Sequence, residues 1–136
     1  MNNDLLIFGD ICPTDDYRHL FDSDNPNKLF NDVIPLIEKS KVCIANIEAP
    51  IIREKTPILK TGPTLSFSKN EADCIKNAGI EVFSFANNHI RDHGNNGVEN
   101  TMDYCDENGL KRIGIGRNFG EAKKAFSTII DGKKIS

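Results

Sequence analysis

The feature that most constrains the fold is a short apolar run that ends directly in polar residues, and the chain repeats it. Such a run is typical of a strand buried on both faces of a parallel sheet, with its polar residues at the strand tip. The examples are Leu5–Phe8 before Gly9 and Asp10, Lys41–Ala45 before Asn46 and Glu48, and Ile80–Ala86 before Asn87, Asn88 and His89. We therefore expect several strand ends to bring polar side chains to one edge of a sheet.

Helical signals lie between and after these strands. The sequence from Ser68 to Glu71 is a capping box, and Gly79 is a suitable C-terminal stop for the helix that it begins. A further helix is predicted from Asn96 to Asn108. Apolar residues from Leu29 to Ile37 also recur at helical spacing, where Pro35 either kinks a helix or begins a shorter one.

The rest of the chain continues the alternation. Lys111–Ile115 and Ser127–Ile130 are predicted strands, a second capping box runs from Asn118 to Glu121, and a turn at Asp131-Gly132 leads into a last strand from residue 133. Alternating strands and helices predict a single α/β domain over residues 1–136, with a mostly parallel sheet flanked by helices and covered on both faces. Because a strand begins at the very end, we expect the natural domain to continue, so that this architecture is truncated.

The composition and charge of the chain argue against several classes of function. A net charge of −3, with 17 basic and 20 acidic residues spread along the chain, provides no electrostatic footprint for nucleic acid. No apolar run approaches the ~20 residues of a membrane span, and the first residues lack the pattern of a signal peptide. The cysteines form no CxxC pair, so we expect reduced thiols and a cytoplasmic location.

Three strand-end residues are candidates to bind a divalent cation. Hard cations prefer oxygen ligands brought from several strand ends, and Asp10, Glu48 and Asn88 meet that need. The alternatives are a turn or cap role for Asp10 and a solvated loop carboxylate for Glu48. The alternative for the Asn-Asn-His run is a local Asx-type turn.

His89 is the candidate acid. Asp92 is placed to accept a ring N–H from His89, which would favour the charged, proton-donating imidazole in a phosphoryl or acyl transfer; the alternative is that Asp92 is a helix-start acid. His19 and His93 lack comparable neighbours, and we expect both at the surface. A nucleotide-binding fold is disfavoured because no glycine-rich loop follows the first strand.

The chain resembles the poly-γ-glutamate capsule biosynthesis family (CapA type), a branch of the calcineurin-like metallophosphoesterase superfamily. The most specific segment is Ala86–Thr101, which is similar to the family signature ANNHxxDxGxxGhxxT, where h is apolar. Weaker similarities are Gly9-Asp10, Asn46–Pro50, Lys60 before Phe67, and Gly114–Ala122. Cys12 stands where the superfamily usually has histidine, and the later histidine blocks of the superfamily have no counterpart here.

The resemblance implies roles for individual residues. Asp10 and Glu48 would be metal-facing acids and Asn88 a metal ligand, while His89 would be the acid or transition-state stabiliser. Asn46, Lys60 and Asn87 would face a small-molecule or polymer substrate.

Two functions follow as hypotheses. The first is a Mn²⁺-, Mg²⁺- or Zn²⁺-dependent, metallophosphoesterase-like hydrolase in capsule or poly-γ-glutamate biosynthesis, with a site that this chain does not complete. The second is a non-catalytic truncated module that associates with itself, as a homo-oligomer, or with a partner chain, since exposed sheet edges seek partners.

Overall fold

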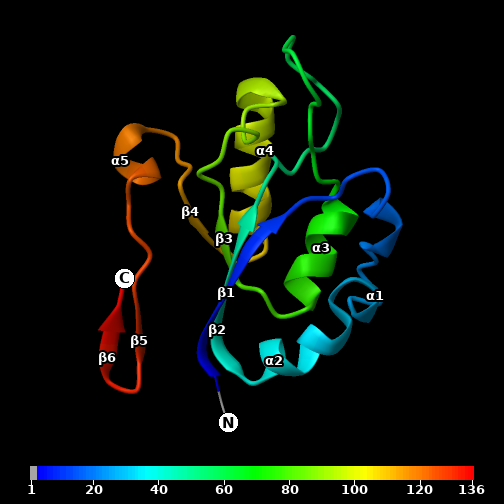
Figure 1. Cartoon of the computed structure of the whole chain (residues 1–136). Helices are drawn as coiled ribbons and strands as arrows, with labels where there is room; N and C mark the ends of the chain where they lie inside the picture. The colour runs from blue at the N-terminus through cyan, green and yellow to red at the C-terminus, as the bar shows by residue number, and fades with distance from the viewer. Residues whose placement is uncertain (1–2) are drawn as a thin grey trace.

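A four-stranded parallel sheet forms the centre of the molecule, whose computed structural model describes residues 3–136 (Figure 1). Its strands lie side by side in chain order: β1 (Asn3–Ile11), β2 (Ser40–Ile47), β3 (Val82–Ser84) and β4 (Lys111–Ile113). All three pairings are parallel. The predicted α/β class and its mostly parallel sheet with flanking helices are therefore confirmed.

The helices follow the strands in the predicted alternation. They are α1 (Asn27–Phe30), α2 (Ile34–Glu38), α3 (Lys69–Asn77), α4 (Gly94–Glu107) and α5 (Phe119–Ala122), with 3₁₀ turns at Arg18–Leu20 and Asn31–Val33. The sequence left two possibilities for Pro35, and the structure places it in the first turn of α2, where its missing N–H costs no hydrogen bond. It therefore begins a shorter helix.

Both predicted capping boxes cap a helix, but only the first is reciprocal. At α3 the Ser68 hydroxyl accepts the N–H of Glu71, and the Glu71 carboxylate accepts the N–H of Ser68. At α5 the side chain of Asn118 accepts the N–H of Glu121, but the Glu121 carboxylate accepts the N–H of Arg117 instead.

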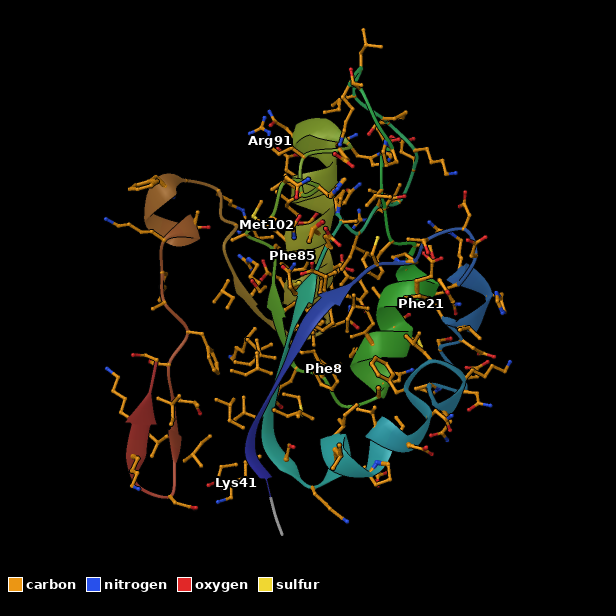
Figure 2. All side chains as sticks on the ribbon, in the orientation of Figure 1. Phe8, Phe21, Lys41, Phe85, Arg91 and Met102 are labelled. Atoms are coloured by element: carbon orange, nitrogen blue, oxygen red, sulfur yellow. The ribbon has the colours of Figure 1, made fainter. Side chains whose placement is uncertain are left out.

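The main core lies between the sheet and α1 to α4. Alternate strand residues point to this side, and Phe8 on β1 stacks edge to face on Phe30 of α1 with ring centroids 6.1 Å apart. Figure 2 labels Phe21, Phe85 and Met102 among the side chains of this core. In a parallel sheet whose strands follow chain order, right-handed crossovers carry every connecting helix to the same face.

The opposite face of the sheet is covered much less. Val42 and Val82 on this face pack against Phe126 and Ile130, whereas Ile7 on the edge strand is 66% exposed. Ile130 belongs to an antiparallel hairpin, β5 (Thr128–Ile130) and β6 (Lys133–Ile135), which forms a separate sheet beside the main one (Figure 1). The expectation that helices cover both faces of the sheet is therefore wrong in detail, because the order of the strands places the helices on one face.

Candidate functional site

The ends of β1, β2 and β3 bring predicted site residues into hydrogen-bond contact. Asp10 lies opposite Asn46 in the β1–β2 register, and the Asn46 amide donates to Asp10 Oδ1 at 2.6 Å. The Asn87 amide, which follows β3, donates to Asn46 Oδ1 at 3.3 Å and to the carbonyl of Ile47 at 2.9 Å. An acid and two amides from three separate strand ends thus form one continuous polar row.

Asn87 also shapes its own loop. Its side-chain oxygen accepts the backbone N–H of His89 at 3.0 Å, which is the Asx-type turn that the sequence left as an alternative. Gly114 permits the close approach that this loop needs, because a Cβ at its φ of +86° would lie 2.6 Å from the backbone nitrogen of Ala86. The local turn and the inter-strand contacts therefore use different atoms of the same Asn87 side chain.

His89 and Asp92 form the second part of the cluster. His89 Nδ1 lies 2.7 Å from Asp92 Oδ2, and Asp92 is 1% exposed. The Lys60 ammonium donates to Asp92 Oδ1 at 2.6 Å, and the N–H of Leu65 donates to Oδ2 at 2.8 Å. Asp92 thus holds the predicted histidine and the predicted lysine in place from a buried position.

The surroundings of Asp92 keep it ionised. Burial works against the charged carboxylate, but hydrogen bonds from Lys60, His89 and the Leu65 N–H outweigh it and hold the Asp92 pKa below its usual value. An ionised Asp92 accepts a hydrogen bond from the Nδ1–H of His89, which leaves Nε2 as the ring nitrogen available to a substrate. This arrangement is the one expected of an oriented acid–base histidine.

His93 is buried, at 3% exposure, so the prediction that it lies at the surface is wrong. Its Nδ1 accepts the N–H of Thr56 at 2.9 Å, and the Thr56 hydroxyl donates to the His93 carbonyl at 3.2 Å. The loop of residues 53–66 is therefore attached to the start of α4 through His93 as well as Asp92. No local pattern could reveal this, because the partner lies 37 residues away in the chain; His19 is exposed, as predicted.

Glu48 and Asn88 are less tightly held than the other site residues. The Glu48 N–H donates to the Ile11 carbonyl at 3.0 Å, which places Glu48 beside the end of β1. Asn88 is exposed, and within residues 3–136 no side-chain hydrogen bond holds its amide. Burial, followed by the nearby Glu48 carboxylate, raises the pKa of Cys12 to about 11, so this residue is a protonated thiol.

The donor chemistry of these residues suits a hard cation only in part. Carboxylate and amide oxygens from Asp10, Glu48 and Asn88 are the right type for Mg²⁺ or Mn²⁺, which usually take six ligands including water. Among the residues that the structure describes, no three acids, histidines or cysteines converge on one point. The role of Asp10, Glu48 and Asn88 as metal ligands stays a prediction.

The family model described as bacterial capsule synthesis protein PGA_cap matches residues 4–136. The chain belongs to this family. The predicted capsule biosynthesis family is thus confirmed, and the segment Ala86–Thr101 that suggested it carries the Asn87, His89 and Asp92 contacts described above.

Two curated relatives are similar to this member of the family. The capsule biosynthesis protein CapA of Bacillus anthracis is 26% identical over 135 residues, which is 97% of this chain and 33% of the relative. The PGA biosynthesis protein CapA of Bacillus subtilis (strain 168) is 26% identical over 102 residues, which is 74% of this chain and 27% of the relative. The chain thus spans between about a quarter and a third of the length of the relatives that it matches. Across the described residues, none of the helices has the length and hydropathy needed to cross a membrane.

Proposed function

We propose that this capsule synthesis family member contributes a metallophosphoesterase-like site to poly-γ-glutamate capsule biosynthesis, with His89 as its acid. The observation that supports the proposal is the buried Asp92 carboxylate 2.7 Å from His89 Nδ1. An imidazole held in this way presents Nε2 to a leaving oxygen and can donate a proton to it. The side chain of His89 is 14% exposed, so a substrate can reach it.

The neighbouring residues have separate roles in this proposal. Asp10, Glu48 and Asn88 would hold a divalent cation, which would polarise a phosphoryl-like centre and neutralise the charge that builds on it. The Asn46 and Asn87 amides position substrate at the strand ends, while Lys60 adds positive charge beside Asp92. The Asp92 carboxylate also fixes the ring of His89, and its hydrogen bond from Lys60 restricts the carboxylate in turn.

Calorimetric titration of Mn²⁺ into the metal-free protein tests the ligand assignment. We expect binding that weakens at least tenfold in both Glu48→Ala and Asn88→Ala, because each substitution removes one oxygen ligand. Glu54→Ala and Asn96→Ala are matched controls, since both residues are exposed and neither side chain forms a hydrogen bond or ion pair among residues 3–136. Binding that is unchanged in the Glu48 and Asn88 variants would exclude these residues as ligands.

Hydrolysis of bis(p-nitrophenyl) phosphate in the presence of Mn²⁺ tests the role of His89. His89→Gln should lower kcat by a factor of about 10² to 10⁴, the usual contribution of a positioned general acid, while leaving Mn²⁺ affinity unchanged. Equal turnover by the wild type and His89→Gln would remove His89 from the mechanism.

A second candidate function, self-association, rests on the thinly covered sheet face. Ile7 is 66% exposed on β1, and Ile129 is 73% exposed on the hairpin beside it. A second copy that covers this face would bury the Ile7 side chain. Sedimentation velocity should then show a concentration-dependent dimer that Ile7→Lys abolishes. A monomer at all concentrations would contradict this function and would leave the metal-site proposal untouched.

A further inference from the structure

The loop of residues 53–66 projects beyond the start of α4 (Figure 1), and these residues form no helix or strand. Its two ends are joined by a bridge between Ile51 and Phe67. Its tip is open to solvent, where the Leu59 side chain is fully exposed. A segment with so little buried apolar surface depends on its hydrogen bonds to keep one conformation.

These hydrogen bonds lead to two consecutive residues at the start of α4, and the first is Asp92. Its carboxylate accepts from Lys60 Nζ at 2.6 Å and from the N–H of Leu65 at 2.8 Å. Its backbone carbonyl accepts the N–H of Ile58 at 2.9 Å. The closed loop therefore places Lys60 against the carboxylate that His89 faces.

His93 is the second of these residues, and its contact with Thr56 permits one protonation state of the ring. The N–H of Thr56 points to His93 Nδ1 at a distance of 2.9 Å. A backbone N–H donates and cannot accept, so this Nδ1 must carry no proton, and the ring is neutral with its proton on Nε2. A proton added to Nδ1 would point at the N–H of Thr56 and turn an attraction into a repulsion.

The charged groups around the His93 ring come from both sides of this contact. Asp92, beside it in the chain, favours protonation, whereas Lys55 from the loop opposes it; burial is the largest effect and lowers the pKa of His93. The Asp92 carboxylate is engaged by Lys60 and His89. Since the Asp92 pKa is held below its usual 3.8, the contact that changes between pH 7.5 and 5 is the one at His93.

We propose that His93 is a latch: its neutral ring holds the loop of residues 53–66 closed on Asp92, and protonation of the ring releases the loop. Through this latch His93 is a positioning residue, because the closed loop supplies the Lys60 hydrogen bond that restricts Asp92. Its effect on catalysis rests on the proposed function of His89. The latch itself rests on the contact with Thr56 alone.

Two NMR measurements on the wild-type protein test the latch. The ¹⁵N shifts of the His93 ring at pH 7.5 should show a proton on Nε2 and none on Nδ1. The protection of the Thr56 amide against hydrogen exchange should fall about tenfold between pH 7.5 and 5, because release of the loop takes up one proton. A proton on Nδ1 at pH 7.5, or protection that stays constant, would overturn the proposal.

Two substitutions of His93 separate the latch from a general loosening of the loop. His93→Asn places an amide oxygen near the position of Nδ1, and this acceptor does not titrate, so the protection of Thr56 should stay constant from pH 7.5 to 5. His93→Leu has no acceptor and should lower that protection about tenfold at pH 7.5. A pH response in His93→Asn equal to that of the wild type would overturn the proposal. If either variant fails to fold, the measurements on the wild type still decide.

His89→Gln is the matched control, because it removes the other histidine of the site and leaves the contact between Thr56 and His93 in place. The pH response of the Thr56 amide should persist in this variant. Loss of the response would assign it to His89 and overturn the latch.

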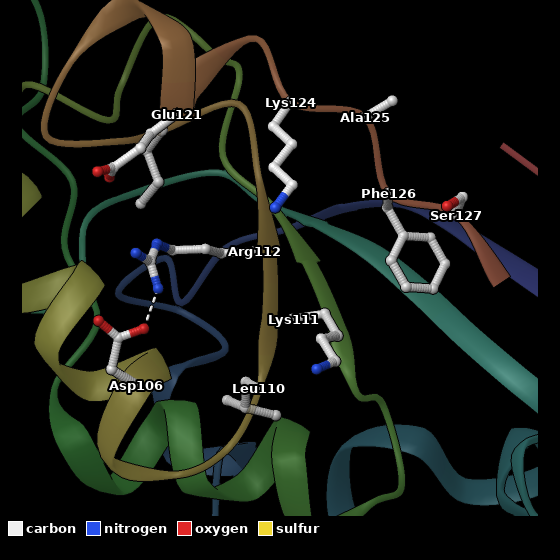
Figure 3. A pocket seen from close by; sticks show the side chains of 10 residues that line it. Asp106, Leu110, Lys111, Arg112, Glu121, Lys124, Ala125, Phe126 and Ser127 are labelled. Carbon is white, nitrogen blue, oxygen red and sulfur yellow. Dashed lines mark hydrogen bonds and ion pairs between the residues drawn. The ribbon is translucent and has the colours of Figure 1, made fainter.

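A remote amide shows whether the loop opens on its own. Lys111 and Lys124 line a cavity beside β4 (Figure 3), and no residue that lines it belongs to the loop. The Lys111 N–H donates to the Glu81 carbonyl at 3.0 Å and should be protected at least about tenfold more than Thr56 at each pH, because the loop opens while the sheet stays folded. Equal protection would mean that Thr56 exchanges only when the whole domain unfolds, which would overturn the proposal.

Hydrolysis of bis(p-nitrophenyl) phosphate with Mn²⁺ tests the effect on His89. At pH 7.5 His93→Leu should have a kcat about tenfold below that of His93→Asn, because the asparagine keeps the latch and the leucine does not. Equal kcat values would overturn the positioning role. An absence of turnover in the wild type would contradict the proposed function, while hydrogen exchange would still decide the latch.

Discussion

Replacing Asp92 with asparagine should destabilise the whole domain, because this carboxylate joins the loop of residues 53–66 to the turn that carries His89. It accepts hydrogen bonds from Lys60 Nζ at 2.6 Å, from His89 Nδ1 at 2.7 Å and from the Leu65 N–H at 2.8 Å. An asparagine keeps the shape but loses the charge, and its amide nitrogen cannot accept either bond made by Oδ2.

The expected magnitude follows from these contacts. Hydrogen bonds to a charged group contribute roughly 1.5–3 kcal/mol each, and one oxygen of the new side chain can still accept. Since the side chains of Lys60 and His89 remain 23% and 14% exposed, solvent compensates in part. We therefore expect a loss of about 3 kcal/mol, which at a typical urea dependence of about 2 kcal/mol per molar lowers the unfolding midpoint by about 1.5 M.

Urea unfolding followed by circular dichroism measures this loss. Asp16→Asn is the control, because Asp16 is exposed and its side chain forms no hydrogen bond or ion pair within residues 3–136, so its free energy of unfolding should stay within about 0.5 kcal/mol of the wild type. The pH dependence gives a second readout. Since the folded Asp92 pKa lies below its usual 3.8, the stability that it provides is complete above that pH and is lost as the pH falls toward the folded value. Asp92→Asn should lose this acid-side slope, and a midpoint equal to that of Asp16→Asn would refute the reasoning.

Three further predictions concern residues that hold the surrounding loops. Burial, with a contribution from Lys55, lowers the pKa of His93, although Asp92 opposes the shift. The free energy of unfolding should therefore fall as the pH drops below about 6.5, because the buried ring resists protonation. Urea titrations between pH 7.5 and 5 should show a smaller decrease in the free energy of unfolding for His93→Gln than for the wild type. Gly114→Ala should cost about 3 kcal/mol or more in the free energy of unfolding, because its φ is +86° and the new Cβ would meet Ala86; an unchanged thermal midpoint would contradict this. Thr101→Val should cost about 1–3 kcal/mol in the same assay, because it leaves the buried Ile51 N–H without its acceptor at 2.8 Å, whereas Thr101→Ser should keep that bond and cost less.

Much of the local structure was predictable because it depends on neighbours in the chain. Ser68 and Glu71 satisfy the free N–H groups of their own helix, so four consecutive residues predict where α3 begins. The apolar run from Leu5 to Phe8 becomes part of β1, and the turn at Asp131-Gly132 joins β5 to β6 as expected. The signature around His89 and Asp92 works in the same way, because a spacing of three residues at a turn places ring and carboxylate within reach.

What the sequence alone determined is therefore the set of strands and helices, the capsule synthesis family and the pairing of His89 with Asp92. The tertiary structure decided that the helices gather on one face of the sheet, that His93 is buried against Thr56, and that Lys111 and Lys124 share a cavity. The physical reason is the range of the interactions involved. Caps, turns and apolar runs depend on residues within a few positions, whereas burial and electrostatic surroundings depend on which distant segments pack together.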